Sequence, residues 1–175
     1  MKIQIRNAYW LLLSLVVFMV DQWTKNQIVA HFDYREVLVI FTSSGAWGVN
    51  LTLAHNYGAA FSFLADQSGW QRWFFAGLAL TVGSGLSVWL LRLQPAQKYL
   101  AVALALLVGG AFGNFYDRVL YGYVVDFVDA YYGAYHWPVF NVADSAICLG
   151  AVLLLLESFI DKSSLDKGSL DKNRE

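Results

Sequence analysis

Two aspartates beside long apolar segments could act together as an acid and a base. Asp126 lies in the stretch VVDFVD (124–129), and Asp144 lies in FNVADS (140–145). Two neighbouring carboxyl groups in a medium of low dielectric constant do not both ionise readily, so the pair shares one proton. The ionised group can then accept a proton from water while the protonated group donates to a carbonyl oxygen. That chemistry is peptide hydrolysis without a covalent intermediate.

Other kinds of catalysis find little support in the sequence. There is one cysteine, Cys148, and the three histidines are scattered, so no metal-ligand spacing occurs. We therefore expect neither a metal nor another cofactor. The motifs Asp-Thr-Gly and Asp-Ser-Gly are absent, which excludes a pepsin-like fold. A formal net charge of −1 predicts no nucleic-acid partner.

More polar residues lie near the ends of the apolar segments, where ionisable groups are costly and usually functional. Asp21 and Lys25 are four residues apart and could form an ion pair at a helix end. Asn114 and Arg118 are also four apart and share a helix face, with Asp117 close to both. We expect Asp117 to pair with Arg118.

The pair formed by Asn141 and Asp144 also has a purely structural explanation. Asparagine is a favoured helix N-cap, and an acidic residue in the first turn complements the helix dipole. On the sequence alone this explanation accounts for Asp144 nearly as well as catalysis does. Asp129, in contrast, is expected to be solvated.

Composition and hydropathy predict an all-α membrane protein with four transmembrane helices. Hydrophobic residues make up 58% of the chain and charged residues only 14%, whereas soluble domains are about 25% charged. A helix needs about 20 residues to cross the hydrocarbon core. The segments that are long and apolar enough are 8–28, 70–91, 99–115 and 142–160.

The distribution of Lys and Arg predicts that both termini are cytoplasmic. Eight of the twelve basic residues lie at the N-terminus, in the connection 92–98 or in the C-terminal tail, and cytoplasmic loops are rich in such residues. Residues 30–69 and 116–140 then lie on the outer face. We expect one transmembrane domain over 1–160, and a charged, disordered cytoplasmic tail over 161–175.

Two further patterns concern packing and the outer face. Ala105, Gly109 and Gly113 recur every four residues and form a small-residue face on which another helix can pack closely. The segment 32–48 contains an apolar run followed by Ser-Ser-Gly, which predicts short β structure ending in a turn.

Five stretches, in this order, resemble the sequence blocks of lipoprotein signal peptidase, the type II signal peptidase of bacteria. They are DQWTK (21–25), NYGAAFSF (56–63), GGAFGNFYDR (109–118), VVDFVD (124–129) and FNVADS (140–145). Any one of them is a weak signal, but five in order are specific, and the four-span layout is similar as well.

The resemblance implies an intramembrane aspartic peptidase of the bacterial cytoplasmic (inner) membrane, with its active site near the outer leaflet. Such an enzyme removes the signal peptide from prolipoproteins and cleaves just before a diacylglyceryl-modified cysteine. The positions that match the catalytic dyad are Asp126 and Asp144. The positions that would bind substrate or support the site are Asp21, Asn56, Gly110, Asn114, Arg118 and Asn141.

The same resemblance implies further structure and partners. A small extracytoplasmic β-cradle and a short outer helix are expected, for which 32–48 and 129–140 are the candidates. The implied partners are lipid-modified prolipoproteins, membrane lipid and an inhibitor of the globomycin type, a cyclic peptide that would block the dyad. We expect a monomer.

Two other classes of function remain open on the sequence. A small proton-coupled transporter would need polar residues through the inner half of the helices. The sequence has few there: Thr81, Ser84, Ser87 and Glu157. A structural lipid-binding protein would not need its aspartates to be charged.

Overall fold

A computed structural model of the protein describes residues 3–43, 45–58 and 69–172, with side chains described as far as Phe159. These described residues form four long helices and one four-stranded sheet. In chain order the elements are the 3-10 helix η1 (Ile5–Tyr9), α1 (Trp10–His31), β1 (Val37–Ser43), β2 (Trp47–Asn56), α2 (Trp70–Arg92), α3 (Lys98–Leu120), β3 (Val124–Tyr132), β4 (Tyr135–His136) and α4 (Val142–Lys172).

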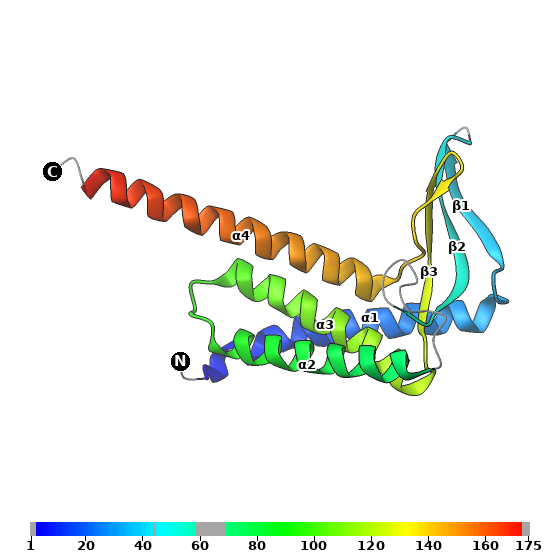
Figure 1. Ribbon diagram of the computed structural model, residues 1–175, viewed down its shortest axis with the longest axis horizontal. Helices are drawn as coiled ribbons and strands as arrows, with labels where there is room; N and C mark the ends of the chain where they lie inside the picture. Colours follow the sequence, from blue (N-terminus) through cyan, green and yellow to red (C-terminus); the bar gives the residue numbers. More distant parts are fainter. Residues whose placement is uncertain (1–2, 44, 59–68, 173–175) are drawn as a thin grey trace.

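The helices run roughly along one direction, and the sheet stands across one end of them (Figure 1). The 3-10 helix η1 and the C-terminal end of α4 lie at the opposite end. The first and the last described helical segments therefore end far from the sheet, on the same side of the molecule. The polar residues singled out in the sequence are found where the helices meet the sheet.

The helix α3 is central, since it packs against α1, α2 and α4. Small residues make this possible, as the sequence predicted. A Cβ atom on Gly109 would lie 2.7 Å from the Ser14 carbonyl oxygen of α1, and one on Gly110 would lie 2.5 Å from the Ala143 carbonyl oxygen of α4. The neighbouring helices thus approach to distances that no larger residue would allow.

Three helices are long and apolar enough to cross a membrane within the described ranges, namely α2, α3 and residues Val142–Phe159 of α4. The helix α1 is of similar length but contains Asp21 and Lys25, both of which are buried. While these charged side chains are buried, large apolar side chains cover the outer surface of the helices. Examples are Leu12, Met19, Leu78, Val82, Leu149 and Leu156. This distribution suits helices that are surrounded by lipid.

The sheet is antiparallel, with the strand order β1-β2-β3-β4. β1 and the turn after it lie within the segment in which the sequence predicted β structure. β2 and β3 were not predicted, so the β structure is more extensive than the expected cradle at 32–48. One face of the sheet packs on the end of α1, where Ile28 contacts Leu53, Val125 and Phe127 in a buried apolar cluster.

Two expectations differ from the observed backbone. The segment 129–140 was the candidate for an outer helix, but it forms the end of β3, a turn at Gly133 and the short strand β4. Gly133 has a φ of 58°, which favours a turn over a helix. The expected disordered tail begins at residue 161, whereas α4 continues through Lys172.

The close packing at Gly110 can be tested by substitution. We expect Gly110→Ala to destabilise the protein by about 1–3 kcal/mol, because the new methyl group overpacks the contact between α3 and α4. The matched control is Gly85→Ala on α2, where an added Cβ meets nothing within 4 Å. Since Ala is the better helix former, this control should be neutral or stabilising. Equal melting temperatures for the two variants would contradict the packing argument.

Candidate active site

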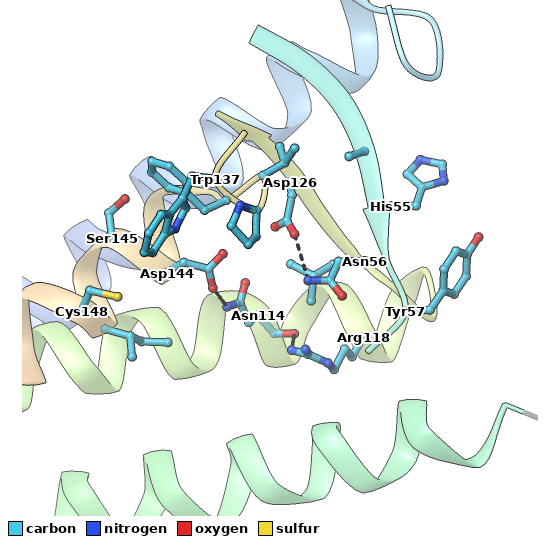
Figure 2. Close-up of a pocket in the computed structure, with 16 residues that line it drawn as sticks. His55, Asn56, Tyr57, Asn114, Arg118, Asp126, Trp137, Asp144, Ser145 and Cys148 are labelled. Carbon is cyan, nitrogen blue, oxygen red and sulfur yellow. Dashed lines mark hydrogen bonds between the residues drawn. The ribbon is translucent and has the colours of Figure 1, made fainter. Parts of the chain in front are cut away.

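Asp126 and Asp144 face the same cavity from two different elements (Figure 2). Asp126 lies on β3, and Asp144 lies in the first turn of α4. The cavity has a volume of about 690 Å³, and both carboxylates line it. The structure therefore brings together the two carboxyl groups that are 18 positions apart in the sequence.

Asp126 is buried in the sheet, outside the long helices, and its carboxylate accepts two side-chain hydrogen bonds. The amide of Asn141 donates to Oδ1 at 2.7 Å, and the amide of Asn56 donates to Oδ2 at 3.0 Å. Burial raises the pKa of Asp126 from 3.8 to about 7, and the nearby charge of Asp144 adds to this rise. Asp126 thus holds a proton more strongly than an ordinary carboxyl group.

Asp144 is fixed in the first turn of α4 by a reciprocal cap. Its backbone N–H donates to Oδ1 of Asn141 at 2.8 Å, and the backbone N–H of Asn141 donates to Oδ2 of Asp144 at 3.3 Å. The amide of Asn114 donates to Oδ1 of Asp144 at 2.7 Å. The predicted helix cap is therefore present, and the residue that forms it also binds Asp126.

A buried lysine orders the amides around the two aspartates. Lys25 Nζ lies 2.8 Å from Asp21 and 2.9 Å from Asp117, and it donates to Oδ1 of Asn114 at 3.1 Å. Because that oxygen is bound to Lys25, the amide nitrogen of Asn114 is turned toward Asp144. The predicted pair of Asp21 and Lys25 is present, whereas the predicted pair of Asp117 and Arg118 is wrong, because Asp117 contacts Lys25 from a neighbouring helix.

The two acidic partners of Lys25 also bind backbone groups of the elements that carry Asp126 and Asp144. Asp21 Oδ1 accepts the backbone N–H of Ala143, in the first turn of α4, at 2.8 Å. Asp117 Oδ2 accepts the backbone N–H of Val125, next to Asp126, at 3.1 Å. One buried charge cluster therefore joins α1, α3, β3 and α4 beside the cavity that the two aspartates line.

Arg118 lies at the edge of the cavity and is held through both its side chain and its backbone. Its guanidinium donates to the carbonyl oxygens of Asn114 and Gly58, at 3.2 and 3.0 Å. Its own carbonyl oxygen accepts a 2.7 Å bond from Arg72, which also binds Val119 and so caps the end of α3. These bonds use two of the five N–H donors of the Arg118 guanidinium.

The rest of the cavity is largely apolar and aromatic. Its walls include His55 and Tyr57 on one side and residues 137–140 on another. Burial lowers the pKa of His55, and its ring stacks on Tyr123 with centroids 3.9 Å apart. Both facts favour a neutral imidazole that acts as part of an aromatic wall. Within the described residues, no group of three or more His, Cys, Asp or Glu side chains could hold a metal ion.

Asp129 is not solvated, contrary to expectation. It is buried, accepts a 2.9 Å bond from the amide of Asn50 and lies 2.7 Å from Nδ1 of His136. Asn50 and His136 lie on the neighbouring strands β2 and β4, so Asp129 links three strands. Its contacts are separate from those of Asp126 and Asp144.

The structure brings all eight predicted site residues to one place. Those that line the cavity are Asn56, Asn114, Arg118, Asp126 and Asp144. Those that hold the lining residues or their helices in position are Asp21, Gly110 and Asn141. Lys25 was predicted only as a partner of Asp21, although a cation in an apolar helix is itself a signal of a site.

The chain is similar to known proteins over most of its length. A sequence model of signal peptidase (SPase) II matches residues 13–160. The chain belongs to the signal peptidase II family. Lipoprotein signal peptidase of Vibrio vulnificus is 48% identical over 158 residues, covering 87% of this chain and 89% of that protein. The Cellvibrio japonicus protein of the same name is 49% identical over 165 residues, covering 93% and 94%.

A solved structure is similar as well. A bacterial membrane enzyme determined by the in meso method at 2.3 Å resolution aligns with a TM-score of 0.77 and 31% identity. The alignment covers 90% of this chain and 91% of that one. The signal peptidase II chain described above therefore has a membrane-enzyme fold made of long helices and a small antiparallel sheet.

The role of Lys25 in this peptidase fold can be tested by replacing it with methionine. Lys25→Met leaves Asp21 and Asp117 buried without their cation, so we expect a loss of about 3–5 kcal/mol in the free energy of unfolding. Thermal melts in detergent would measure the loss, with Lys98→Met at the exposed start of α3 as control. Adding Asp21→Asn to Lys25→Met should restore part of the stability. If Lys25→Met melted like the control, the charge cluster would not hold the fold together.

Proposed function

We propose that the protein is an intramembrane aspartic endopeptidase that removes the signal peptide from diacylglyceryl-modified prolipoproteins. It cleaves the bond just before the lipid-modified cysteine. The observation that carries this proposal is the shared cavity of Asp126 and Asp144, with a raised pKa at Asp126. Membership of the signal peptidase II family supports the class of substrate.

The two carboxyl groups divide the chemistry between them. In this proposal Asp144, which lies in the first turn of α4 and accepts a hydrogen bond from the amide of Asn114, is the base. It takes a proton from a water molecule, whose oxygen attacks the scissile carbonyl carbon. Asp126, whose raised pKa favours the protonated form, donates its proton to the carbonyl oxygen. The tetrahedral gem-diol then collapses: the proton held by Asp144 passes to the leaving amine, and one hydroxyl group of the gem-diol returns a proton to Asp126, which leaves a carboxylic acid product and restores both aspartates.

Arg118 is suited to hold the substrate next to the dyad. It lines the cavity, and its guanidinium has donors beyond the two that bind Asn114 and Gly58. In this proposal it binds a carbonyl oxygen of the substrate near the scissile bond. A cyclic peptide of the globomycin type would occupy the same cavity and block both carboxyl groups.

We further propose that α1 crosses the membrane with α2, α3 and α4. The charged side chains of α1 are buried against the other helices, and its outer surface is apolar. With the termini in the bacterial cytoplasm, the sheet and the dyad lie near the outer leaflet of the cytoplasmic membrane. A lipid-modified cysteine at that surface would lie at the depth of the two aspartates. In this proposal the protein acts as a monomer.

The proposed chemistry predicts the behaviour of two conservative variants. Asp126→Asn and Asp144→Asn each remove one proton-transfer group without changing the size of the side chain. We expect either variant to lose at least about a hundredfold in the rate of cleavage. The measurement is release of the signal peptide from a lipid-modified prolipoprotein by purified protein.

Asp129→Asn is the matched control for these variants. Asp129 lies on the same strand as Asp126, but its contacts are to Asn50 and His136. We expect this control to cleave at a rate close to that of the wild type. Full activity of Asp126→Asn or of Asp144→Asn would refute the dyad.

A further inference from the structure

The C-terminal end of α3 is capped by a residue of another helix, Arg72 in the first turn of α2. The last carbonyl groups of a helix have no partner within the helix. Arg72 supplies partners for two of them: Nε donates to the carbonyl oxygen of Arg118 at 2.7 Å, and Nη2 donates to that of Val119 at 2.6 Å. Its positive charge also complements the helix dipole at this end. The backbone position of Arg118 therefore depends on α2.

The fork shape of the Arg72 guanidinium suits this contact. Two adjacent carbonyl oxygens need two donors at a fixed separation, which a guanidinium has and a lysine ammonium lacks. The guanidinium also lies over the ring of Trp73, with Cζ 4.6 Å from the centroid. It lies beside the turn after α3 as well, since a Cβ added to Gly122 would be 3.4 Å from Nη1 of Arg72. These neighbours favour one orientation of the guanidinium, the one that binds the end of α3.

Arg118 is the cavity residue that this cap holds in place. Its side chain leaves the last turn of α3, and its guanidinium donates to the carbonyl oxygens of Asn114 and Gly58 at the edge of the cavity. On α2, one turn after Arg72, the centroid of the Phe75 ring lies 5.5 Å from Cζ of Arg118. The helix α2 thus contacts Arg118 twice, at its backbone through Arg72 and at its guanidinium through Phe75.

Without Arg72, two carbonyl groups in the last turn of α3 lose their side-chain partner, and the turn that carries Arg118 would fray. We propose that Arg72 is a positioning residue of the peptidase and that it acts on cleavage through Arg118. This assignment rests on the proposed function, in which Arg118 binds a carbonyl oxygen of the substrate. Asp126 and Asp144 keep their own hydrogen bonds when Arg118 moves, so the step that suffers is substrate binding. The expected result is a higher KM with a nearly unchanged kcat.

The first measurement is the kinetics of variants at position 72. Arg72→Met removes both donors and should raise the KM for a lipid-modified prolipoprotein about tenfold, since a hydrogen bond from a charged group is weakened. Arg72→Lys keeps the charge but loses the fork, so it should recover only part of this loss. Arg92→Met, at the exposed opposite end of α2, is the matched control and should behave as the wild type. Each variant is assayed well below its melting temperature, so that unfolded protein does not contribute.

The decisive comparison repeats Arg72→Met in protein that already carries Arg118→Met. If Arg72 acts through Arg118, the loss in kcat/KM caused by Arg72→Met disappears in this background. An equal loss with and without Arg118 would mean that Arg72 only stabilises the fold. An unchanged KM in Arg72→Met alone would mean that Arg118 needs no cap from α2. Either result overturns the assignment.

The position of Arg118 can also be observed without any substrate. In NMR spectra of protein labelled with ¹⁵N-arginine, a guanidinium whose rotation is hindered by hydrogen bonds gives separate Nη signals, and those of Arg118 are assigned by their loss in Arg118→Met. Arg72→Met should merge these signals, whereas Arg92→Met should leave them separate. Unchanged signals in Arg72→Met would overturn the assignment even if KM rises. If the wild type cleaves no prolipoprotein, the proposed function fails, and the spectra still show whether Arg72 positions Arg118.

Discussion

The buried ion cluster of Lys25 with Asp21 and Asp117 is the interaction on which the rest of the structure depends. One buried ammonium group binds two buried carboxylates, and each carboxylate also accepts a backbone N–H from an element that carries Asp126 or Asp144. Such a cluster contributes little net stability to a protein, but the loss of one member strongly destabilises the fold, because a buried charge is left without its partner. Here the cluster fixes geometry, because it sets the orientation of Asn114 and the position of α4 relative to β3.

Small residues allow that cluster to form. Gly109, Gly110 and Gly113 let α1 and the first turn of α4 approach α3 closely, and a Cβ on Gly113 would lie 2.6 Å from Oδ2 of Asp21. In lipid, helices associate through such packing and through polar contacts, since apolar side chains gain nothing by leaving lipid for protein. The same three glycines that bring the helices together therefore also make room for the buried charges.

Much of the helical fold and of the helix packing was predictable from the sequence, because those predictions used local regularities. Hydropathy gave the helices, the four-residue spacing of glycines gave the central packing face, and Asn141 was expected as a cap. Contacts between distant segments were not predictable in the same way. Asp117 was paired with its neighbour Arg118, although its cation comes from α1, and Asp129 was expected to be solvated because nothing in VVDFVD shows that Asn50 and His136 lie on adjacent strands.

The central claim is that Asp126 and Asp144 are held close enough in a buried site to share a proton. Infrared titration of the protonated carboxyl band, assigned by its loss in Asp126→Asn, tests this claim directly. Asp126 should keep its proton up to about pH 7 and lose it as the pH rises further. In Asp144→Asn its pKa should fall, because a negative neighbour is removed, yet stay above 3.8 because the burial remains. Ionisation near pH 4 in the wild type, or a titration unchanged by Asp144→Asn, would contradict the account.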